Sequence, residues 1–273
     1  ELIGVQPMTG PVGQIHTLRV RYADTDNGAT AGEEALSPFK IANAYSGAPG
    51  SSAAPGATGV LEGIPGNKMS IQILKQTVEA KTRRLSARWT FEASQDAQSQ
   101  HGIDVEAEVM AALAQEITTE IDQEIIGSLT TLSGTAVDTY DQAAVSGTAT
   151  FVGDEHAALA VLVNRAANII AARTRRGAGN WVVVSPFALT ILQSATTSAF
   201  ARTTEGTFEA PTNTKFVGTL NSSVRVYVNQ YAADSAAVLV GYKGPGEMDA
   251  ASFYCPYIPL MSSGVVLDPS SFE

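Results

Sequence analysis

The sequence has little of what metal and redox chemistry require. Its 273 residues include one cysteine, Cys255, and three histidines, His16, His101 and His156. A single cysteine excludes an intrachain disulfide and a thiolate metal cluster. No second His or Glu lies at ligand spacing from any of the histidines on a shared helix face. We therefore expect no metal centre, and we interpret Cys255 as a buried, inert thiol.

Positive charge is also scarce, and long apolar runs are missing. Lys and Arg total 17 against 27 Asp and Glu, which gives a net charge of -10. This balance argues against gripping nucleic acid, because phosphate contacts need clustered Lys and Arg. No apolar run approaches the roughly 18 residues of a membrane span, and no signal-peptide pattern is present. We expect a soluble, acidic, non-secreted protein without a membrane anchor.

The sequence signatures of catalysis and nucleotide binding are absent as well. There is no Gly-x-Ser-x-Gly elbow and no phosphate-binding loop. The Gly177–Gly179 turn precedes a strand, whereas a dinucleotide fingerprint follows one. Asp24–Gly28 faintly resembles a calcium loop, but the twelfth position is Ala35, where a bidentate Glu is needed. We predict that the protein is not an enzyme and binds no cofactor.

What the sequence does have is one very long amphipathic helix, predicted over Asp104–Leu132. Apolar residues recur there every four positions from Val105 to Ile125, a spacing that is typical of a helix and excludes a strand. Asp104 can cap the first turn, and Gly134 is expected to end the helix in a left-handed conformation. At about 1.5 Å per residue the helix spans roughly 40 Å. We expect the rest of the fold to be built around it.

Glu116, Glu120 and Glu124 form a like-charged row on this helix at i, i+4 spacing. Such a row is mildly destabilising by itself, by about 0.2–0.5 kcal/mol per pair. Two interpretations stay open. The row is either a solvated face, or a face neutralised by basic residues from elsewhere in the chain or from a neighbouring chain.

The residues before the helix predict a two-stranded arm with a long loop at its tip. Thr17–Tyr22 alternates polar and apolar residues, and Met69–Val78 resumes the alternation, so the two can pair antiparallel. Residues 24–66 between them are rich in Gly and Pro and poor in large apolar residues. Such a segment cannot bury enough surface to offset its ordering entropy. Because a two-stranded ribbon is marginal alone in water, we expect the arm to lie on another subunit.

Another alternating strand is predicted from Arg84 to Phe91, between the arm and the long helix. Its polar face and the preceding residue carry three arginines, Arg83, Arg84 and Arg88. We expect these arginines to pair with acidic residues of an adjacent surface.

Helices and strands alternate behind the long helix. Asp154 is expected to cap a second helix, which ends at Arg173, Arg175 and Arg176. These three arginines suit the negative end of the helix dipole, and an intersubunit salt bridge is the alternative. Ser185 and Pro186 open a third helix as N-cap and first helical residue.

The remaining pattern is that of strands. They are predicted at Trp181–Val184, Phe216–Leu220, Val224–Val228, Ala237–Val240 and Ser252–Leu260, with a hairpin turn at Asn221-Ser222. Helices and strands are mixed without βαβ regularity, which indicates an α+β fold.

Six short segments, in order over nearly the whole chain, carry a family resemblance. They are Gln6–Gly13, Val78–Leu85, His101–Asp104, Asn180–Ser185, Gly241–Ala250 and Tyr254–Leu260. Gly241–Ala250 is the most specific, because a ten-residue run of that composition is hard to reach by chance. Together these segments resemble the major capsid protein family of T-even-type (myovirus-like) tailed bacteriophages.

The resemblance implies the Hong Kong 97-type capsid fold, an α+β fold with a long spine helix, an E-loop β-arm, a peripheral domain and an axial domain. The implied parts are an N-terminal arm and first strand (1–21), an E-loop with a Gly/Pro-rich tip and reduced insertion (22–78), a peripheral domain (79–154) with its spine helix (104–132), an axial domain (155–250) and a return strand to the peripheral domain (251–273).

The function implied is that of a major capsid protein, which self-assembles as hexamers and pentamers into an icosahedral shell around phage double-stranded DNA. Implied partners are further copies of the chain and vertex, portal and decoration proteins, with no sequence-specific DNA binding and no membrane. The implied location is the virion, after assembly in the host cytoplasm. Two alternatives stay open: a pentamer-only vertex protein of the same family, and an encapsulin-like compartment with an enzyme cargo.

Overall fold

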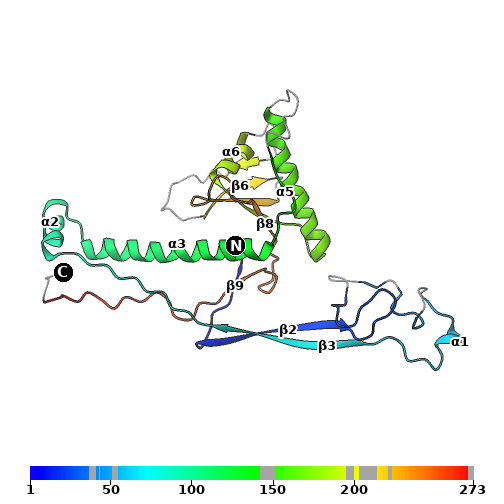
Figure 1. Ribbon diagram of the computed structural model, residues 1–273. Helices are drawn as coiled ribbons and strands as arrows, with labels where there is room; N and C mark the ends of the chain where they lie inside the picture. Colours follow the sequence, from blue (N-terminus) through cyan, green and yellow to red (C-terminus); the bar gives the residue numbers. More distant parts are fainter. Residues whose placement is uncertain are drawn as a thin grey trace. The chain divides into compact units, whose positions relative to one another are not determined.

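The computed structural model describes residues 1–36, 41–42, 44–50, 55–141, 152–194, 200–202, 214–220 and 223–269 (Figure 1). The chain divides into two compact units. The first comprises residues 1–7, 80–166 and 179–273, and the second comprises residues 8–79 and 167–178. Each unit has a buried apolar cluster of its own.

The long helix of the first unit is α3, Val105–Ser133, which confirms the predicted helix. The Asp104 carboxylate accepts the N–H of Glu106 at 3.1 Å and so caps the first turn, as this residue type does at a helix start. Gly134 ends the helix with φ of 70°, but its ψ of -136° is not left-handed helical. The predicted left-handed cap is therefore wrong, although the positive φ still favours glycine, which has no Cβ.

A five-stranded sheet forms the core of the first unit, in the order β5–β6–β7–β4–β8. The strands are β4 Trp181–Val184, β5 Phe200–Arg202, β6 Thr214–Leu220, β7 Val224–Asn229 and β8 Leu239–Gly241. β4 and β7 are parallel, and the other neighbours are antiparallel. The β6–β7 pairing confirms the predicted hairpin strands, while the turn at Asn221-Ser222 lies outside the described residues. A mixed sheet with helices fits the α+β class.

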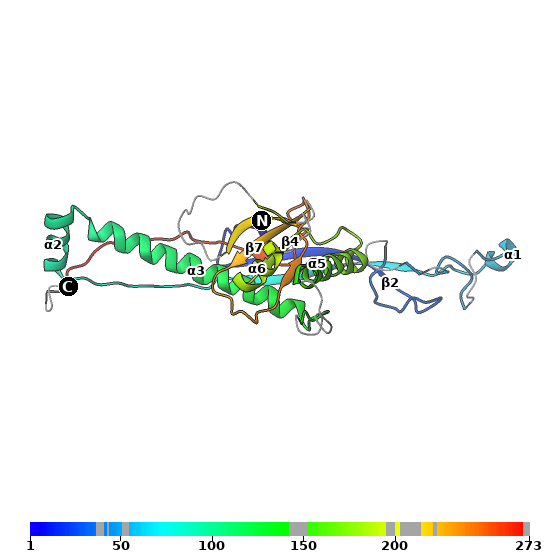
Figure 2. The same ribbon diagram turned by 90° about the horizontal axis from the view of Figure 1, so that it is seen from above.

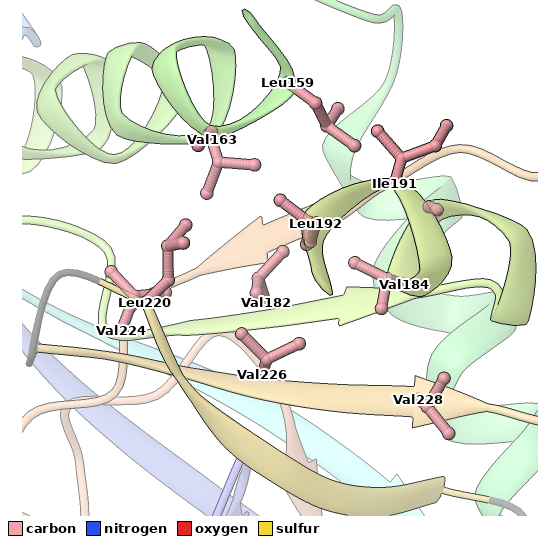
Figure 3. Close-up of a cluster of buried hydrophobic side chains, with 12 residues drawn as sticks. Leu159, Val163, Val182, Val184, Ile191, Leu192, Leu220, Val224, Val226 and Val228 are labelled. Carbon is pink, nitrogen blue, oxygen red and sulfur yellow. The ribbon is translucent and has the colours of Figure 1, made fainter. Parts of the chain in front are cut away.

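Both faces of this sheet are covered, because successive residues of a strand point to opposite sides. One face packs against α5 (Val152–Thr174) and α6 (Pro186–Ser194), and Figure 3 shows the resulting cluster. Its labelled members are Leu159, Val163, Val182, Val184, Ile191, Leu192, Leu220, Val224, Val226 and Val228. The opposite face presents Trp181 and Val183 to Leu129, the buried residue of α3. The sheet is thus joined to the long helix near the C-terminal end of that helix.

The boundaries of the other elements follow the sequence with small differences. Ser185 Oγ accepts the N–H of Ala188 at 3.3 Å, which confirms the predicted start of α6. α5 begins at Val152, so Asp154 lies in its first turn and is not the cap. The strand predicted over Ser252–Leu260 is reduced to two residues, β9.

The N-terminal residues are an integral part of the first unit. β1 (Gly4–Val5) pairs in parallel with β9 (Phe253–Tyr254). A Cβ on Gly4 would lie 2.6 Å from the Phe253 ring, so only glycine allows this approach. Leu2 and Ile3 pack on the same apolar cluster as Trp181. This segment therefore ties the return strand to the sheet.

The second unit contains the predicted two-stranded ribbon. β2 (Val12–Tyr22) and β3 (Met69–Glu79) are antiparallel, with Val12 opposite Glu79 and Tyr22 opposite Met69. β2 starts five residues earlier than predicted. The pairing itself is confirmed, and among the described strands none pairs with the outer edge of β3. The outer edge of β2 is bonded near Tyr22 to residues 32–35, through the N–H of Ala35 to the Val20 carbonyl and the N–H of Tyr22 to the Glu33 carbonyl.

The tip of the ribbon is better ordered than its composition predicts. Ala29, Ala35 and Tyr45 are buried around Tyr22. The two tyrosine rings meet edge to face with centroids 4.6 Å apart, a favourable aromatic geometry. Tyr45 Oη donates to the Lys68 carbonyl at 2.5 Å. The expectation of a loop without a buried apolar cluster is therefore wrong for these residues, because small alanines fit where large side chains are lacking.

The strand predicted from Arg84 to Phe91 is wrong. Residues 80–90 run extended towards α2 (Figure 2), but none of the described strands pairs with them, and a strand requires a hydrogen-bonded neighbour. Phe91 instead begins α2, Phe91–His101. Thr90 Oγ1 accepts the N–H of Ala93 at 3.2 Å as the N-cap, and Gly102 ends the helix in the left-handed conformation.

One substitution tests the packing of the sheet on its α3 side. A Cβ on Gly241 would lie 2.0 Å from the buried Trp181 ring. Gly241→Ala is expected to lower the free energy of unfolding by about 1–3 kcal/mol, the usual cost of overpacking. Urea unfolding of the dissociated chain, followed by tryptophan fluorescence, measures this loss.

Gly127→Ala serves as the matched control, because nothing lies within 4 Å of a Cβ at this helical position. It is expected to leave stability unchanged or to raise it by up to about 1 kcal/mol. Equal unfolding midpoints for Gly241→Ala and the wild type would show that Trp181 is not packed against β8.

Candidate interaction surfaces

Arg83 joins the extended segment 80–90 to the acidic row of α3. Its Nη1 lies 3.3 Å from Glu120 Oε2, and its Nη2 pairs with Glu124. The planar guanidinium presents several donors and can serve both carboxylates. The three side chains are more than one-third exposed, so each pair is worth at most about 1 kcal/mol. Part of the acidic row is therefore neutralised from within the chain.

Arg84 and Glu116 are left without such a partner. Both side chains are exposed, and neither forms an ion pair with a residue that the structure describes. Neighbouring residues of an extended segment point to opposite sides. Since Arg83 faces α3, Arg84 faces away from it. Arg88 is exposed as well, and pairing of Arg84 and Arg88 with another subunit stays a prediction.

The three arginines at the end of α5 are exposed. The helix ends at Thr174, and Arg175 has a positive φ of 53° while its N–H donates to the Ala171 carbonyl at 2.8 Å. Arg173, Arg175 and Arg176 thus lie at the negative end of the helix dipole, where a cation is favourable. The intersubunit role of these residues stays a prediction.

One face of the β2–β3 ribbon carries exposed apolar side chains. Leu18, Ile71 and Ile73 are 66%, 72% and 68% exposed. Leu18 lies directly opposite Ile73, so the two side chains share a face. An apolar face beside an open strand edge is typical of a surface that another chain covers.

A second apolar surface lies near the C-terminal end of the described chain. Residues 257–267 have no regular secondary structure. Their exposed apolar side chains are Tyr257, Ile258, Leu260, Met261, Val265, Val266 and Leu267. Apolar exposure over one continuous segment of this kind indicates an interaction surface rather than scattered surface residues.

Asp26 organises the polar part of the ribbon tip. Its carboxylate accepts hydrogen bonds from Asn67 Nδ2 at 3.0 Å and from the backbone N–H groups of Gly50 and Asn27 at 2.9 Å. These bonds hold the pKa of Asp26 below its usual value, the Asn67 bond most strongly and the Gly50 bond next. The aspartate recruits backbone donors to the tip, which no feature of the sequence predicted.

One side-chain pair could suggest nucleophilic chemistry. His156 Nδ1 lies 2.7 Å from Ser194 Oγ. Ser194 Oγ also donates to the Thr190 carbonyl at 2.8 Å. The hydroxyl thus has helix carbonyl acceptors as well as the imidazole within reach, and no described carboxylate is hydrogen-bonded to His156 to orient it as the base of an activated serine.

The described residues contain neither a metal cluster nor a membrane-spanning helix. Within them, no group of three or more His, Cys, Asp and Glu side chains could hold a metal ion. Among the same residues, no helix combines the length and the apolar character needed to cross a bilayer.

Sequence reasoning missed the polar contact between α3 and the sheet. Gln123 Nε2 donates to Asn229 Oδ1 at 2.9 Å, and Asn229 is 6% exposed. Both residues line a cavity of about 220 Å³ at this junction. They are 106 positions apart, so no local pattern could have paired them.

These surfaces define a class of protein. The ribbon face and segment 257–267 leave continuous apolar surface uncovered, while the described side chains form no catalytic constellation. A structural subunit, completed by contacts with other chains, has this organisation.

Comparison with known proteins is consistent with that class. The family model of the major capsid protein Gp23 matches residues 1–63 and 51–273, which together cover the chain. The chain belongs to the Gp23 major capsid protein family.

Individual relatives carry the same description. The major capsid protein of Vibrio phage KVP40 is 36% identical over 211 residues, covering 71% of this chain and 41% of the relative. That of Enterobacteria phage T4 is 35% identical over 229 residues, covering 77% of this chain and 43% of the relative. That of Salmonella phage ViI is 28% identical over 298 residues, covering 95% and 67%. The chain thus spans less than half the length of the KVP40 and T4 relatives that it matches.

The lowered pKa of Asp26 predicts a pH-dependent ribbon tip. A carboxylate with a depressed pKa stabilises the folded form above its unfolded pKa, and this contribution is lost as pH falls through the folded value. The protection of the Gly50 amide against hydrogen exchange is therefore expected at pH 6, and it is expected to be lost only as the pH falls through the lowered pKa of Asp26, below the usual range of an aspartate. Amide exchange measured by NMR at several pH values, as protection factors, checks this.

Asp26→Asn tests the assignment, because it removes the charge and turns an amide N–H₂ towards the donors. Its Gly50 amide is expected to be unprotected already at pH 6. Glu62→Gln, at an exposed carboxylate of the same tip, is the matched control and should behave as the wild type. A protected Gly50 amide in Asp26→Asn would contradict the assignment.

Proposed function

We propose that this chain is a shell subunit, whose copies associate as hexamers and pentamers into an icosahedral container for phage double-stranded DNA. The observation that carries the proposal is the match to the major capsid protein family along the whole chain. The exposed apolar face of the ribbon supports it, since a shell subunit must leave such surface open for its neighbours.

The proposal includes the Hong Kong 97-type arrangement. In it, α3 is the spine helix, residues 22–78 are the E-loop, and residues 155–250 are the axial domain. The peripheral domain comprises residues 79–154, and residues 251–273 return to it. The length of α3, 29 residues, and the ribbon pairing of β2 with β3 support these assignments.

In the proposed assembly the protein acts through the contacts that its copies make with one another. The ribbon of one copy lies on another copy and buries Leu18, Ile71 and Ile73, which are exposed in the single chain. Burial of apolar surface stabilises association by about 25 cal/mol per Å² before the cost of ordering is subtracted. Repetition of one weak contact around a closed shell makes the sum large.

The proposed partners and location follow from the same role. The shell is completed by vertex, portal and decoration proteins, and it is assembled in the host cytoplasm and carried in the virion. The net charge of -10 suits a container that holds DNA without gripping it. The relatives matched are described as phage major capsid proteins, which favours this role over a vertex protein or an encapsulin-like compartment.

A charge reversal tests the assembly. Arg84→Glu combined with Arg88→Glu is expected to reduce the yield of particles about fivefold or more, because like charges at a repeated contact oppose association. Negative-stain microscopy and sedimentation of the purified chain measure the yield.

Lys81→Gln is the control. Lys81 lies in the same extended segment on the side of Arg83, opposite to Arg84, and glutamine removes its charge without adding a carboxylate beside the acidic row of α3. The particle yield of Lys81→Gln is expected to equal that of the wild type. Absence of particles from the wild-type chain, under conditions in which its relatives assemble, would argue against the proposed function itself. Unchanged particles from the double variant would argue against the arginine contacts alone.

A further inference from the structure

A second cavity, of about 430 Å³, lies at one end of the five-stranded sheet. Two neighbouring strands, β4 and β7, place side chains there. Trp181 begins β4, Arg225 lies beside it in β7, and Gly241 is its partner in β8. Lys243 follows β8 and also lines the cavity. An acidic chain with 17 basic residues in total thus gathers two cations at one place.

The backbone around Lys243 is held firmly. The Asn180 side chain donates to the Lys243 carbonyl at 2.6 Å and accepts its N–H at 3.0 Å. The N–H of Gly244 donates to the Asp249 carbonyl at 2.9 Å. The lysine is therefore carried by a fixed turn, and the wall of the cavity is built before anything binds to it.

Two donors of this cavity have no acceptor. Trp181 is 4% exposed, and its Nε1–H has no hydrogen-bond partner. The Lys243 side chain is half-buried, and its ammonium group makes no ion pair with the described part of the chain. A buried donor without an acceptor carries a free-energy penalty, and so does a half-buried cation without a counter-charge. Trp181 and Lys243 both line the cavity, and an anionic group that reached both donors would remove both penalties.

The residues around Glu1, which also line the cavity, show which kind of anion it stabilises. The Glu1 carboxylate accepts a hydrogen bond from Tyr227 Oη and lies 3.3 Å from Arg225 Nη1. The Tyr227 bond and the Arg225 charge both lower the pKa of Glu1, so the cavity stabilises an ionised carboxylate. These two donors are already used by Glu1, whereas Lys243 and Trp181 are not.

We propose that Lys243 and the Trp181 indole bind a second carboxylate, supplied by an Asp or Glu side chain of another copy of this chain. The excess of 27 acidic over 17 basic residues makes such a group the most abundant anion on any neighbouring copy. That the carboxylate comes from another copy rests on the proposed self-assembly, whereas the presence of a carboxylate-binding site does not.

The site is tested first in the dissociated chain with acetate as the probe. Labelling the tryptophans with ¹⁵N gives two indole N–H signals, and Trp89→Phe identifies that of Trp181. Acetate is expected to shift the Trp181 signal saturably at constant ionic strength, whereas chloride is not. Lys243→Met should bind acetate about tenfold more weakly, since a charged hydrogen bond is lost. Lys81→Met, at an exposed lysine outside the cavity, should bind as the wild type does.

The remaining outcomes separate the sources of the anion. A larger and tighter response to inorganic phosphate than to acetate would overturn the carboxylate assignment, and equal acetate binding by Lys243→Met would overturn the site. For the assembled protein, particles of Lys243→Met are expected to dissociate at lower urea than those of the wild type and of Lys81→Met. Equal dissociation would overturn the second copy as the source. Wild-type chain that forms no particles would refute the proposed function, and the acetate titration would still decide the site.

Discussion

The fold depends on the packing of the C-terminal part of α3 against one face of the five-stranded sheet. Leu129 is buried there between Trp181 and Val183, with Ile125 one turn away. Further towards its N-terminus, α3 keeps its apolar residues only half-covered. The helix is therefore anchored at one end and offers the rest of its length to other contacts. A compact monomer would bury both ends of so long an apolar stripe.

Polar side chains add directional contacts between elements that also pack through apolar side chains. Gln123 and Asn229 join the helix to the sheet, and Arg83 holds the extended segment to the acidic row. Each of these bonds is modest in water. These bonds also fix the relative position of the elements that they join, because a hydrogen bond is directional and an apolar contact is not. These bonds hold elements of the first unit together, and Asp26 and Tyr45 do the same at the tip of the ribbon.

Much of this architecture follows from local signals in the sequence. α3 was predictable from its four-residue period and the Asp104 cap, α6 from Ser185, and the ribbon from the alternation that ends at Tyr22. α2 was missed although Thr90 and Gly102 are start and stop signals, because its residues lack an apolar stripe. The alternation before α2 predicts a strand, but alternation within one segment is the same in a strand and in an extended chain that has no partner.

The sequence predicts that the chain has interaction surfaces, but it does not predict which residues those surfaces contact. The need for a partner followed from the composition of the arm, but the acidic row could have faced solvent, the same chain or a neighbour. Glu120 is 37 positions from Arg83, and only the folded chain brings the two together. Order at the tip was missed for the same reason, since Asp26 and Asn67 are 41 positions apart.

The central claim is that this chain is a structural unit which other copies complete, and the ribbon gives the most direct test. Hydrogen exchange of the Ile71 and Ile73 backbone amides is measured in dissociated chain and in assembled particles, with the core amide of Val182 as the internal reference. The account predicts that exchange of the ribbon amides slows by about tenfold or more on assembly, while Val182 is protected in both states. Ribbon amides that are already as protected as Val182 in the dissociated chain would contradict it.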